Sequence, residues 1–253
     1  MFKKFASSAL VAAALFSGSL SAQAAEVLRV ATNPTFPPFE FVNSETKEAT
    51  GFEMDLIRAM GKELGMEVKI MNIGFDGIIP ALLAGTADVG ASGFSITEER
   101  KKRVLFTKPF YQSGLTILTT KVGAKEIKGF EDLKGKTIAV QIGTTAAAKA
   151  KEIEGAKVTT FNNASEAIMD LSTGNSVAVI NDRPVTDYIL MQQPGLADKT
   201  VHLSDKMLSA DDFAMVIPKS NPELCEKLDG AMQKLKDNGE YAKIWKKWFG
   251  DAK

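Results

Sequence analysis

The sequence predicts an α/β fold with a mostly parallel sheet. The sequence contains two kinds of segment, one after the other along the chain. In the first kind apolar and polar residues alternate, and in the second kind apolar residues recur every three to four positions. These are the spacings of strands and helices, respectively. The connections between the segments are short. Strands and helices that alternate at short spacing form parallel sheets covered by helices, which is the basis of this prediction.

The first half of the chain shows this alternation clearly. Apolar residues recur every fourth position between Phe52 and Leu64, and Gly65 ends the predicted helix. The loop 33–39 contains three prolines, which exclude a helix or a central strand. In order, we expect strands over 26–32, 66–73 and 89–91 and helices over 52–64 and 78–84.

The second half repeats the pattern with longer interruptions. The continuous apolar run 177–180 is typical of a buried parallel strand, and Ser165 is expected to cap a helix. A Lys- and Gly-rich stretch, 121–136, is expected at the surface. Further strands are expected over 104–106, 115–119, 136–142, 158–161 and 212–218, and helices over 146–153, 165–172, 222–238 and 241–249.

One stretch, 87–103, offers the groups that bind a small anion. An apolar run ends in Ser92-Gly93-Phe94-Ser95, and Arg100 follows at the start of a charged helix. Hydroxyls, backbone N–H groups and a guanidinium suit a carboxylate, because guanidinium binds it through two parallel charge-assisted hydrogen bonds. A buried strand, a capped helix and a solvated basic turn would explain the same residues, so both interpretations stay open here.

Other strand ends carry candidate ligand groups. Gly143-Thr144-Thr145 precedes a predicted helix, whose free N–H groups and positive dipole end attract anions. The further glycines of a dinucleotide fingerprint are missing. Asp182 follows the run 177–180 and could equally cap the next turn. Phe36 and Phe39, in the proline loop after the first strand, are either core residues or a platform for a ligand.

The composition excludes several classes of function. The chain has 253 residues, enough for one large domain or two smaller ones. Its 31 basic and 31 acidic residues balance, which does not indicate nucleic acid or an anionic membrane surface as a partner. His202 and Cys225 are single residues of their types, so we expect no zinc site and no intrachain disulfide. Cys225 lies on a helical pattern and is expected to be buried and inert.

The first 24 residues have the features of a secretory signal peptide. Lys3 and Lys4 precede a short apolar core, 9–16, and Ala22-Gln23-Ala24 is an A-x-A cleavage site. The apolar core is too short to span a bilayer comfortably. No Cys follows the cleavage site. We therefore expect Sec export and cleavage near Ala24, giving a soluble protein that is not a lipoprotein.

Several stretches of the sequence form distinctive motifs: Pro37-Pro38-Phe39-Glu40-Phe41, Gly51-Phe52-Glu53-Met54-Asp55-Leu56, Phe75-Asp76-Gly77-Ile78-Ile79-Pro80-Ala81-Leu82, Ser95-Ile96-Thr97-Glu98-Glu99-Arg100, and Asn238-Gly239-Glu240-Tyr241 with Trp245-Lys246-Lys247-Trp248-Phe249-Gly250. These stretches resemble the periplasmic polar amino-acid-binding proteins that feed ABC importers. This group, solute-binding protein family 3, contains glutamine, histidine and lysine/arginine/ornithine binders. The resemblance covers essentially all of the mature chain and keeps the motif order.

The resemblance implies a type II periplasmic-binding-protein fold, with two α/β lobes and a ligand cleft between them. The first lobe would be discontinuous, 25–110 plus 212–253, and the second would span 111–211. Two crossings between the lobes are expected near 110–114 and 209–213. The lobes would close around the ligand by a hinge motion.

The resemblance also implies which residues bind the carboxylate of an amino acid. Arg100 is similar to the family arginine that pairs with the ligand α-carboxylate. Ser95 and the N–H group of Thr145 would complete the shell of this carboxylate, and Thr144 would lie beside them.

The other half of the implied site receives the ammonium and the side chain. Asp182 resembles the family acid that takes the α-ammonium, helped by Ser92 and the backbone at Gly93. Phe36 and Phe75 would sandwich the aliphatic part of the ligand side chain. A desolvated zwitterion needs one fixed partner of each sign, so the implied roles agree with the physics of the site.

Selectivity is where the sequence departs from its relatives. Related glutamine and basic-residue binders generally have an Asp at the position of Asn33, and the glutamine binder has a Lys at that of Gln141. Both positions carry uncharged amides here, which favours a polar, uncharged side chain, glutamine first. Glu40, close to the proline loop, could instead receive a guanidinium or ammonium group, so an arginine or lysine ligand is the alternative.

A different class of function exists on the same fold, an exported cyclohexadienyl dehydratase. Dehydration needs a general acid near the leaving hydroxyl, and we recognise neither paired carboxylates nor a suitably placed His. We therefore expect binding without catalysis and without a cofactor. The expected partners are a free L-amino acid and an ABC permease in the inner membrane, and the protein is expected to be a monomer. Signalling through a membrane receptor stays open.

Overall fold

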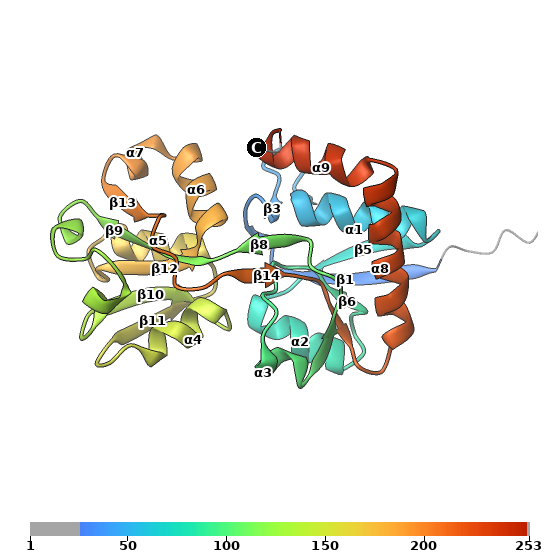
Figure 1. The fold of residues 1–253 in the computed structure, drawn as a ribbon, viewed down its shortest axis with the longest axis horizontal. Helices are drawn as coiled ribbons and strands as arrows, with labels where there is room; N and C mark the ends of the chain where they lie inside the picture. The colour runs from blue at the N-terminus through green and yellow to red at the C-terminus, as the bar shows by residue number, and fades with distance from the viewer. Residues whose placement is uncertain (1–25, 252–253) are drawn as a thin grey trace, which may run out of the picture.

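The computed structural model describes residues 26–251. The predicted signal peptide, 1–24, lies outside the described residues. The described chain forms two α/β lobes, each built on a five-stranded sheet, with extended segments running between them (Figure 1). The predicted fold class is therefore confirmed.

The first lobe is built on a sheet with strand order β5-β1-β6-β15-β7. β1 pairs in parallel with β5 and β6, whereas β15 pairs antiparallel with β6 and β7. The strands are β1 (Val27–Thr32), β5 (Glu67–Asn72), β6 (Val89–Gly90), β7 (Val104–Phe106) and β15 (Val216–Pro218). The helices are α1 (Phe52–Glu63), α2 (Phe75–Leu83), α3 (Glu98–Lys101), α8 (Pro222–Asp237) and α9 (Glu240–Phe249).

The two C-terminal helices return to this first lobe. α8 and α9 pack against α1, close to the N-terminal strand β1 (Figure 1). The Phe52 ring lies 5.7 Å from Trp245 and 5.1 Å from Phe249, measured between ring centroids. Phe52 itself is fully buried. Because aromatic side chains bury large apolar areas, this contact between distant segments stabilises the lobe.

The second lobe is built on a sheet with strand order β11-β10-β12-β9-β13. β10 pairs in parallel with β11 and β12, and β9 pairs antiparallel with β12 and β13. The strands are β9 (Leu115–Thr120), β10 (Thr137–Gln141), β11 (Lys157–Phe161), β12 (Ala178–Asp182) and β13 (Thr200–Leu203). The helices are α4 (Thr145–Glu152), α5 (Ala164–Ser172), α6 (Arg183–Gln192) and α7 (Pro194–Ala197), with short 3₁₀ helices η1 (Gly123–Lys125) and η2 (Phe130–Leu133).

Two extended segments run between the lobes. β8 (Tyr111–Ser113) and β14 (Asp211–Phe213) pair antiparallel and cross the gap between the two main sheets (Figure 1). Tyr111 and Phe213 pack edge-on against Phe39, with ring centroids 4.8 and 5.3 Å away. A small antiparallel sheet of β2 (Thr35–Phe36), β3 (Glu40–Val42) and β4 (Ala49–Thr50) completes the first lobe.

Several element predictions differ from the structure. The predicted strand 212–218 is two strands, β14 and β15, which belong to different sheets. α2 begins at Phe75, three residues before the predicted start. α5 is capped by Asn163 and not by Ser165, because the Asn163 carboxamide oxygen accepts the Glu166 N–H at 2.9 Å. The proline loop also holds the short strand β2.

Two segments were misjudged or missed. The stretch 121–136, expected at the surface, contributes the buried side chains of Ile127 and Leu133 to the core of the second lobe. The segment 183–203, for which the sequence predicted no element, forms α6, α7 and β13. The prediction for Cys225 agrees better, since its side chain is buried and burial raises the pKa of its thiol to about 11.

Candidate ligand-binding site

All twelve predicted site residues line one cavity between the lobes, with an empty volume of about 300 Å³ including its opening. Those from the first lobe are Asn33, Phe36, Glu40, Phe75, Ser92, Gly93, Ser95 and Arg100, and those from the second are Gln141, Thr144, Thr145 and Asp182. Most of them come from the carboxyl ends of β1, β6, β10 and β12 and from the starts of α2 and α4, whereas Phe36, Glu40 and Arg100 lie in β2, β3 and α3. Ligand groups gather at such edges in α/β folds, because several strands end there together.

Arg100 supplies the positive charge of the cavity. Its guanidinium donates to the Ser95 carbonyl at 2.8 Å and, across to the second lobe, to the Gly143 carbonyl at 3.1 Å. It also lies over the rings of Phe75 and Phe94, 5.5 and 5.1 Å from their centroids. Burial lowers the pKa of Arg100 to about 10, so the group stays charged at neutral pH. The guanidinium therefore stands fixed between the lobes, ready to pair with an anion.

Two hydroxyl groups from opposite lobes meet beside Arg100. Ser95 Oγ lies 3.5 Å from Thr145 Oγ1. The neighbouring Thr144 hydroxyl has a different task, since it donates to the Gln141 carbonyl at 2.7 Å and accepts the Ala147 N–H at 3.1 Å. Thr144 therefore caps α4, which leaves Ser95 and Thr145 as the hydroxyls free to meet a ligand.

Asp182 supplies the negative charge at the end of β12. Its side chain is only 6% exposed, and Ser113 of β8 donates to Oδ1 at 2.6 Å. Within the described chain the carboxylate makes no capping bond to α6, so the capping interpretation is wrong. Burial raises the pKa of Asp182 to about 7, and the Ser113 bond opposes this shift. Ser113 was missed because nothing local marks a serine in a crossing strand as a partner for residue 182.

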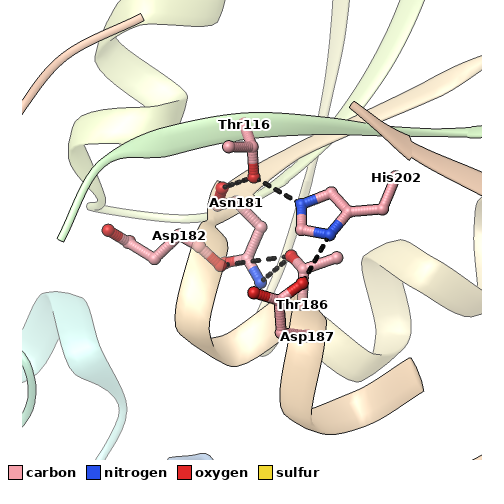
Figure 2. Close-up of polar contacts among 6 residues, drawn as sticks. All are labelled: Thr116, Asn181, Asp182, Thr186, Asp187 and His202. Atoms are coloured by element: carbon pink, nitrogen blue, oxygen red, sulfur yellow. Dashed lines mark hydrogen bonds and ion pairs between the residues drawn. The ribbon is translucent and has the colours of Figure 1, made fainter. Parts of the chain in front are cut away.

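A polar network holds the strand end behind Asp182 (Figure 2). His202 Nδ1 lies 2.8 Å from Asp187 Oδ1, and its Nε2 lies 2.8 Å from Thr116 Oγ1. Thr116 in turn donates to the Asn181 carbonyl at 3.2 Å. Burial lowers the pKa of His202, partly offset by Asp187. Figure 2 shows the Asp182 carboxylate pointing away from this network, so His202 positions the backbone and does not enter the cavity. Residues 26–251 contain no cluster of side chains suited to a metal.

The two amides expected to set selectivity bind each other across the cleft. Gln141 Nε2 donates to Asn33 Oδ1 at 3.0 Å and to the Asn162 carbonyl at 3.1 Å. Asn33 Oδ1 also accepts from the Thr35 hydroxyl at 2.7 Å. Both amides are buried. The amide pair carries no charge, and it joins the lobes in the closed arrangement.

A pair of buried carboxyl groups lies near the Asn33–Gln141 amide pair. This finding corrects the expectation that the chain has no paired carboxyl groups. Glu40 and Glu53 are both 0% exposed. Ser92 Oγ donates to Glu40 Oε1 at 3.3 Å, and the Gly93 N–H donates to Glu53 Oε2 at 2.7 Å. Burial, reinforced by the charge of Glu53, raises the pKa of Glu40 well above its usual range. A glutamate in the apolar first turn of α1 was the available signal, since Phe52 and Met54 on either side of it are also buried.

Aromatic rings form the walls of the cavity. Phe36 and Phe75 are each 8% exposed and line it from the proline loop and from α2. Phe75 stacks on Phe94 with centroids 4.5 Å apart. Gly93 has φ +59°, and a Cβ added there would lie 2.9 Å from the Phe36 ring. Glycine is thus required at this position both for its backbone conformation and for the close approach of the ring.

Comparisons with known proteins agree with this geometry. The model of the family of bacterial extracellular solute-binding proteins, family 3, matches residues 28–251. ABC transporter arginine-binding protein 1 of Escherichia coli strain K12 is 32% identical, over 95% of this chain and 98% of the relative. An ancestral arginine-binding protein was solved with arginine (39% identity, TM-score 0.83, 88% of this chain and 98% of that one) and with glutamine (40% identity, TM-score 0.83, 89% and 98%). In the described part of the chain no helix has the length and apolarity to cross a membrane.

Proposed function

Because this chain belongs to the bacterial extracellular solute-binding proteins of family 3, we propose that it captures a free L-amino acid in the periplasm and presents it to an ABC permease in the inner membrane. The observation that carries the proposal is a closed cavity with one cation, Arg100, and one buried anion, Asp182, from opposite lobes. A zwitterion leaving water needs one fixed partner of each sign. Only a closed arrangement brings both partners to the same ligand.

Each end of the zwitterion has its own set of groups. Arg100, with the Ser95 and Thr145 hydroxyls, would bind the α-carboxylate. Asp182 would take the α-ammonium, with Ser92 and Gly93 on the opposite wall. The raised pKa of Asp182, about 7, means that an arriving ammonium would draw off any proton that the empty site holds.

For the ligand side chain we propose a cationic group, arginine first. Arg100 and Asp182 are neutralised by the two ends of the zwitterion, and Glu40 is the further acidic group in the cavity wall. A guanidinium beside Glu40 would balance that carboxyl group. Relatives whose names specify arginine support this order. Glutamine is the second candidate, because the Asn33–Gln141 amide pair is uncharged and suits a carboxamide.

The ligand proposal is tested by titrating the twenty amino acids by calorimetry. We expect arginine to bind most tightly and glutamine more weakly. Glu40→Gln should weaken arginine by about 2 kcal/mol, roughly thirtyfold, because it removes one partner of a desolvated ion pair. Glutamine should change little in that variant, and the exposed Glu48→Gln serves as the matched control. A wild-type protein that prefers glutamine, with arginine unaffected by Glu40→Gln, would refute the arginine assignment.

We further propose that the lobes, 25–110 with 212–253 and 111–211, move as rigid bodies about β8 and β14. The bonds from Arg100 to Gly143 and from Gln141 to Asn33 join the lobes and would break on opening. Small-angle scattering should show a smaller radius of gyration with ligand than without it, for a monomer in both states.

N-terminal sequencing of the secreted protein tests cleavage near Ala24.

We infer a binding role and not an enzymatic one. Of the two paired carboxyl groups, Glu53 does not line the cavity and Glu40 faces the proposed cationic side chain. The relatives compared above are named as binding proteins, which supports this inference. The ligand should therefore be recovered unchanged, by NMR, after prolonged incubation with the protein. Steady conversion of a bound compound would favour the dehydratase-like alternative.

A further inference from the structure

The fully buried Glu53 has no place in the binding roles described so far. It lies in the first turn of α1, outside the cavity lining, next to Glu40. The Gly51 N-cap has φ +132°, and the Glu53 N–H donates to the Phe39 carbonyl at 3.0 Å. A Cβ at residue 51 would lie 2.1 Å from that carbonyl oxygen. The backbone around Glu53 is thus held firmly, and its carboxyl group has a fixed position beside Glu40.

The two carboxyl groups leave two oxygens without donors. Ser92 and Gly93 satisfy one oxygen of each group, Glu40 Oε1 and Glu53 Oε2. The remaining oxygens, Glu40 Oε2 and Glu53 Oε1, are buried and have no hydrogen-bond partner among the described residues when both groups are treated as acceptors. Glu40 and Glu53 lie within hydrogen-bonding reach of each other. A bond between two carboxyl groups requires a proton on one of them, and such a proton would satisfy both oxygens.

Nearby charges do not replace that proton. Arg100 and Asp182 line the same cavity and neutralise each other or a bound zwitterion. On the helices that pack against α1, Lys247 of α9 pairs with Asp55, and Lys234 of α8 pairs with Glu63.

The pKa values agree with a retained proton. Burial raises the pKa of Glu53 to about 8, and that of Glu40 rises well above its usual range. Both pKa values lie above neutral pH, so each carboxyl group keeps its proton in the ligand-free cavity.

We propose that both carboxyl groups of the Glu40–Glu53 pair are protonated in the ligand-free cavity, that a cationic ligand side chain displaces one of these two protons into solvent, and that Glu53 is the positioning residue that shares the remaining proton with Glu40. The pair then changes from neutral to a single negative charge and balances the cation, whereas a neutral side chain leaves both protons in place. The cavity can thereby take cationic or uncharged side chains without stranding a buried ion. The inference rests on the proposed capture of an amino acid and adds proton release to it.

The contrast between arginine and citrulline isolates this proton. Citrulline has an uncharged ureido group in place of the guanidinium and shares the α-carboxylate and α-ammonium. Asp182 releases a proton with both ligands, so its contribution cancels in the difference. Calorimetry at pH 7 in buffers of different ionisation enthalpy gives the number of protons released from the slope of the observed heat. For the wild-type protein we expect arginine to release close to one proton more than citrulline.

Glu53→Gln is the variant that tests the positioning role. Its amide can donate to Glu40 in place of the shared proton, and its carbonyl oxygen can still accept the Gly93 N–H. Besides burial, the charge of Glu53 and its hydrogen bond both raise the pKa of Glu40, so Glu40 of the variant should already be ionised when the ligand arrives, and arginine should bind without the excess proton. The ratio of arginine to citrulline affinity should rise with pH in the wild type, by up to about tenfold per pH unit, and stay flat in the variant. Glu63→Gln, on the same helix but paired with Lys234, should behave as the wild type.

Two results would overturn the inference. One is equal proton release for arginine and citrulline when both bind the wild type, and the other is an undiminished excess in Glu53→Gln. If citrulline gives no heat, the arginine release of the wild type minus that of Glu53→Gln decides by the same criterion. Absence of any arginine binding would refute the ligand assignment itself, whereas binding without excess release refutes this inference alone.

Discussion

Asp182→Asn removes the buried anion of the cavity while keeping its shape. Ser113 donates to Asp182 Oδ1 at 2.6 Å, and the amide oxygen of the variant can accept the same bond. The α-ammonium of the ligand would then lie opposite a neutral group in a cavity closed from water. Losing one partner of a desolvated charge pair costs about 2–5 kcal/mol, which corresponds to a roughly 30- to 5,000-fold weaker affinity.

The same variant should stabilise the ligand-free protein at alkaline pH. Burial raises the pKa of Asp182 to about 7, against an ordinary value of 3.8. For an acid with a raised folded-state pKa, the stabilising contribution is complete below about pH 4 and is lost as pH rises through about 7. A shift of about 3 units amounts to roughly 4 kcal/mol at most, because opening of the lobes lets water reach the carboxylate. The amide never ionises and avoids this cost.

Two assays separate the effects. Calorimetric titration with arginine measures the loss of affinity, and urea unfolding without ligand at pH 5 and pH 8.5 measures stability. We expect Asp182→Asn to exceed the wild type slightly at pH 5, where part of the contribution is already lost, and by clearly more at pH 8.5, where all of it is lost. Asp198→Asn, at an exposed position of the same lobe, is the control. Affinity within about threefold of the wild type, or the same pH dependence of unfolding in both proteins, would refute the reasoning.

Three further substitutions test separate features. Arg100→Lys should weaken ligand binding by about thirtyfold in calorimetry, because an ammonium cannot bind a carboxylate in the bidentate way while also holding the carbonyls of both lobes. Gly51→Ala should lower the free energy of unfolding in urea by about 3 kcal/mol or more, since its Cβ would lie 2.1 Å from the Phe39 carbonyl oxygen. Gly143→Ala should weaken binding by about tenfold and leave the ligand-bound protein more open in small-angle scattering, because its Cβ would lie 3.0 Å from Asp76 of the other lobe.

Matched controls distinguish these effects from general damage. Arg103→Lys keeps the charge at a surface position and should bind ligand normally. Gly65→Ala and Gly174→Ala also place a side chain at positive φ, +70° and +83°, but this side chain meets no atom within 4 Å. Each should lose only about 1 kcal/mol of stability. Equal losses at Gly51 and Gly65, or equal affinities for Gly143→Ala and Gly174→Ala, would contradict the steric arguments.

Much of the site could be predicted because its signals are local. Arg100 follows small hydroxyl residues at a helix start, and Gly143-Thr144-Thr145 ends one strand and begins one helix. Such patterns depend on a few neighbouring residues, whose backbone geometry is nearly the same wherever they occur. The resemblance then placed Asp182 and the aromatic walls, and the structure brings all of these residues to one cavity.

Two predictions, the strand over 212–218 and the residue that caps α5, differ from the structure. The strand expected over 212–218 is locally uniform in pattern, yet β14 belongs to the crossing and β15 to the first sheet. The predicted cap of α5 was Ser165, but Asn163, two positions earlier, has the extended backbone and caps the helix. The division of 212–218 is made by pairing with distant strands, β8 for β14 and β6 and β7 for β15, which a local pattern does not contain.

The sequence by itself determined the α/β alternation, the charged residues available for a zwitterion and the glycines that allow close approach. Only the tertiary structure decided which of these groups meet. Ser113 reaches Asp182, 69 residues away in sequence, because β12 pairs with β9, the strand that follows β8, and this pairing sets Asp182 opposite Leu115. Glu40 and Glu53 become partners because the Gly51 turn folds α1 back onto the proline loop. Pairing of buried charges depends on burial and distance, and both are properties of the folded chain.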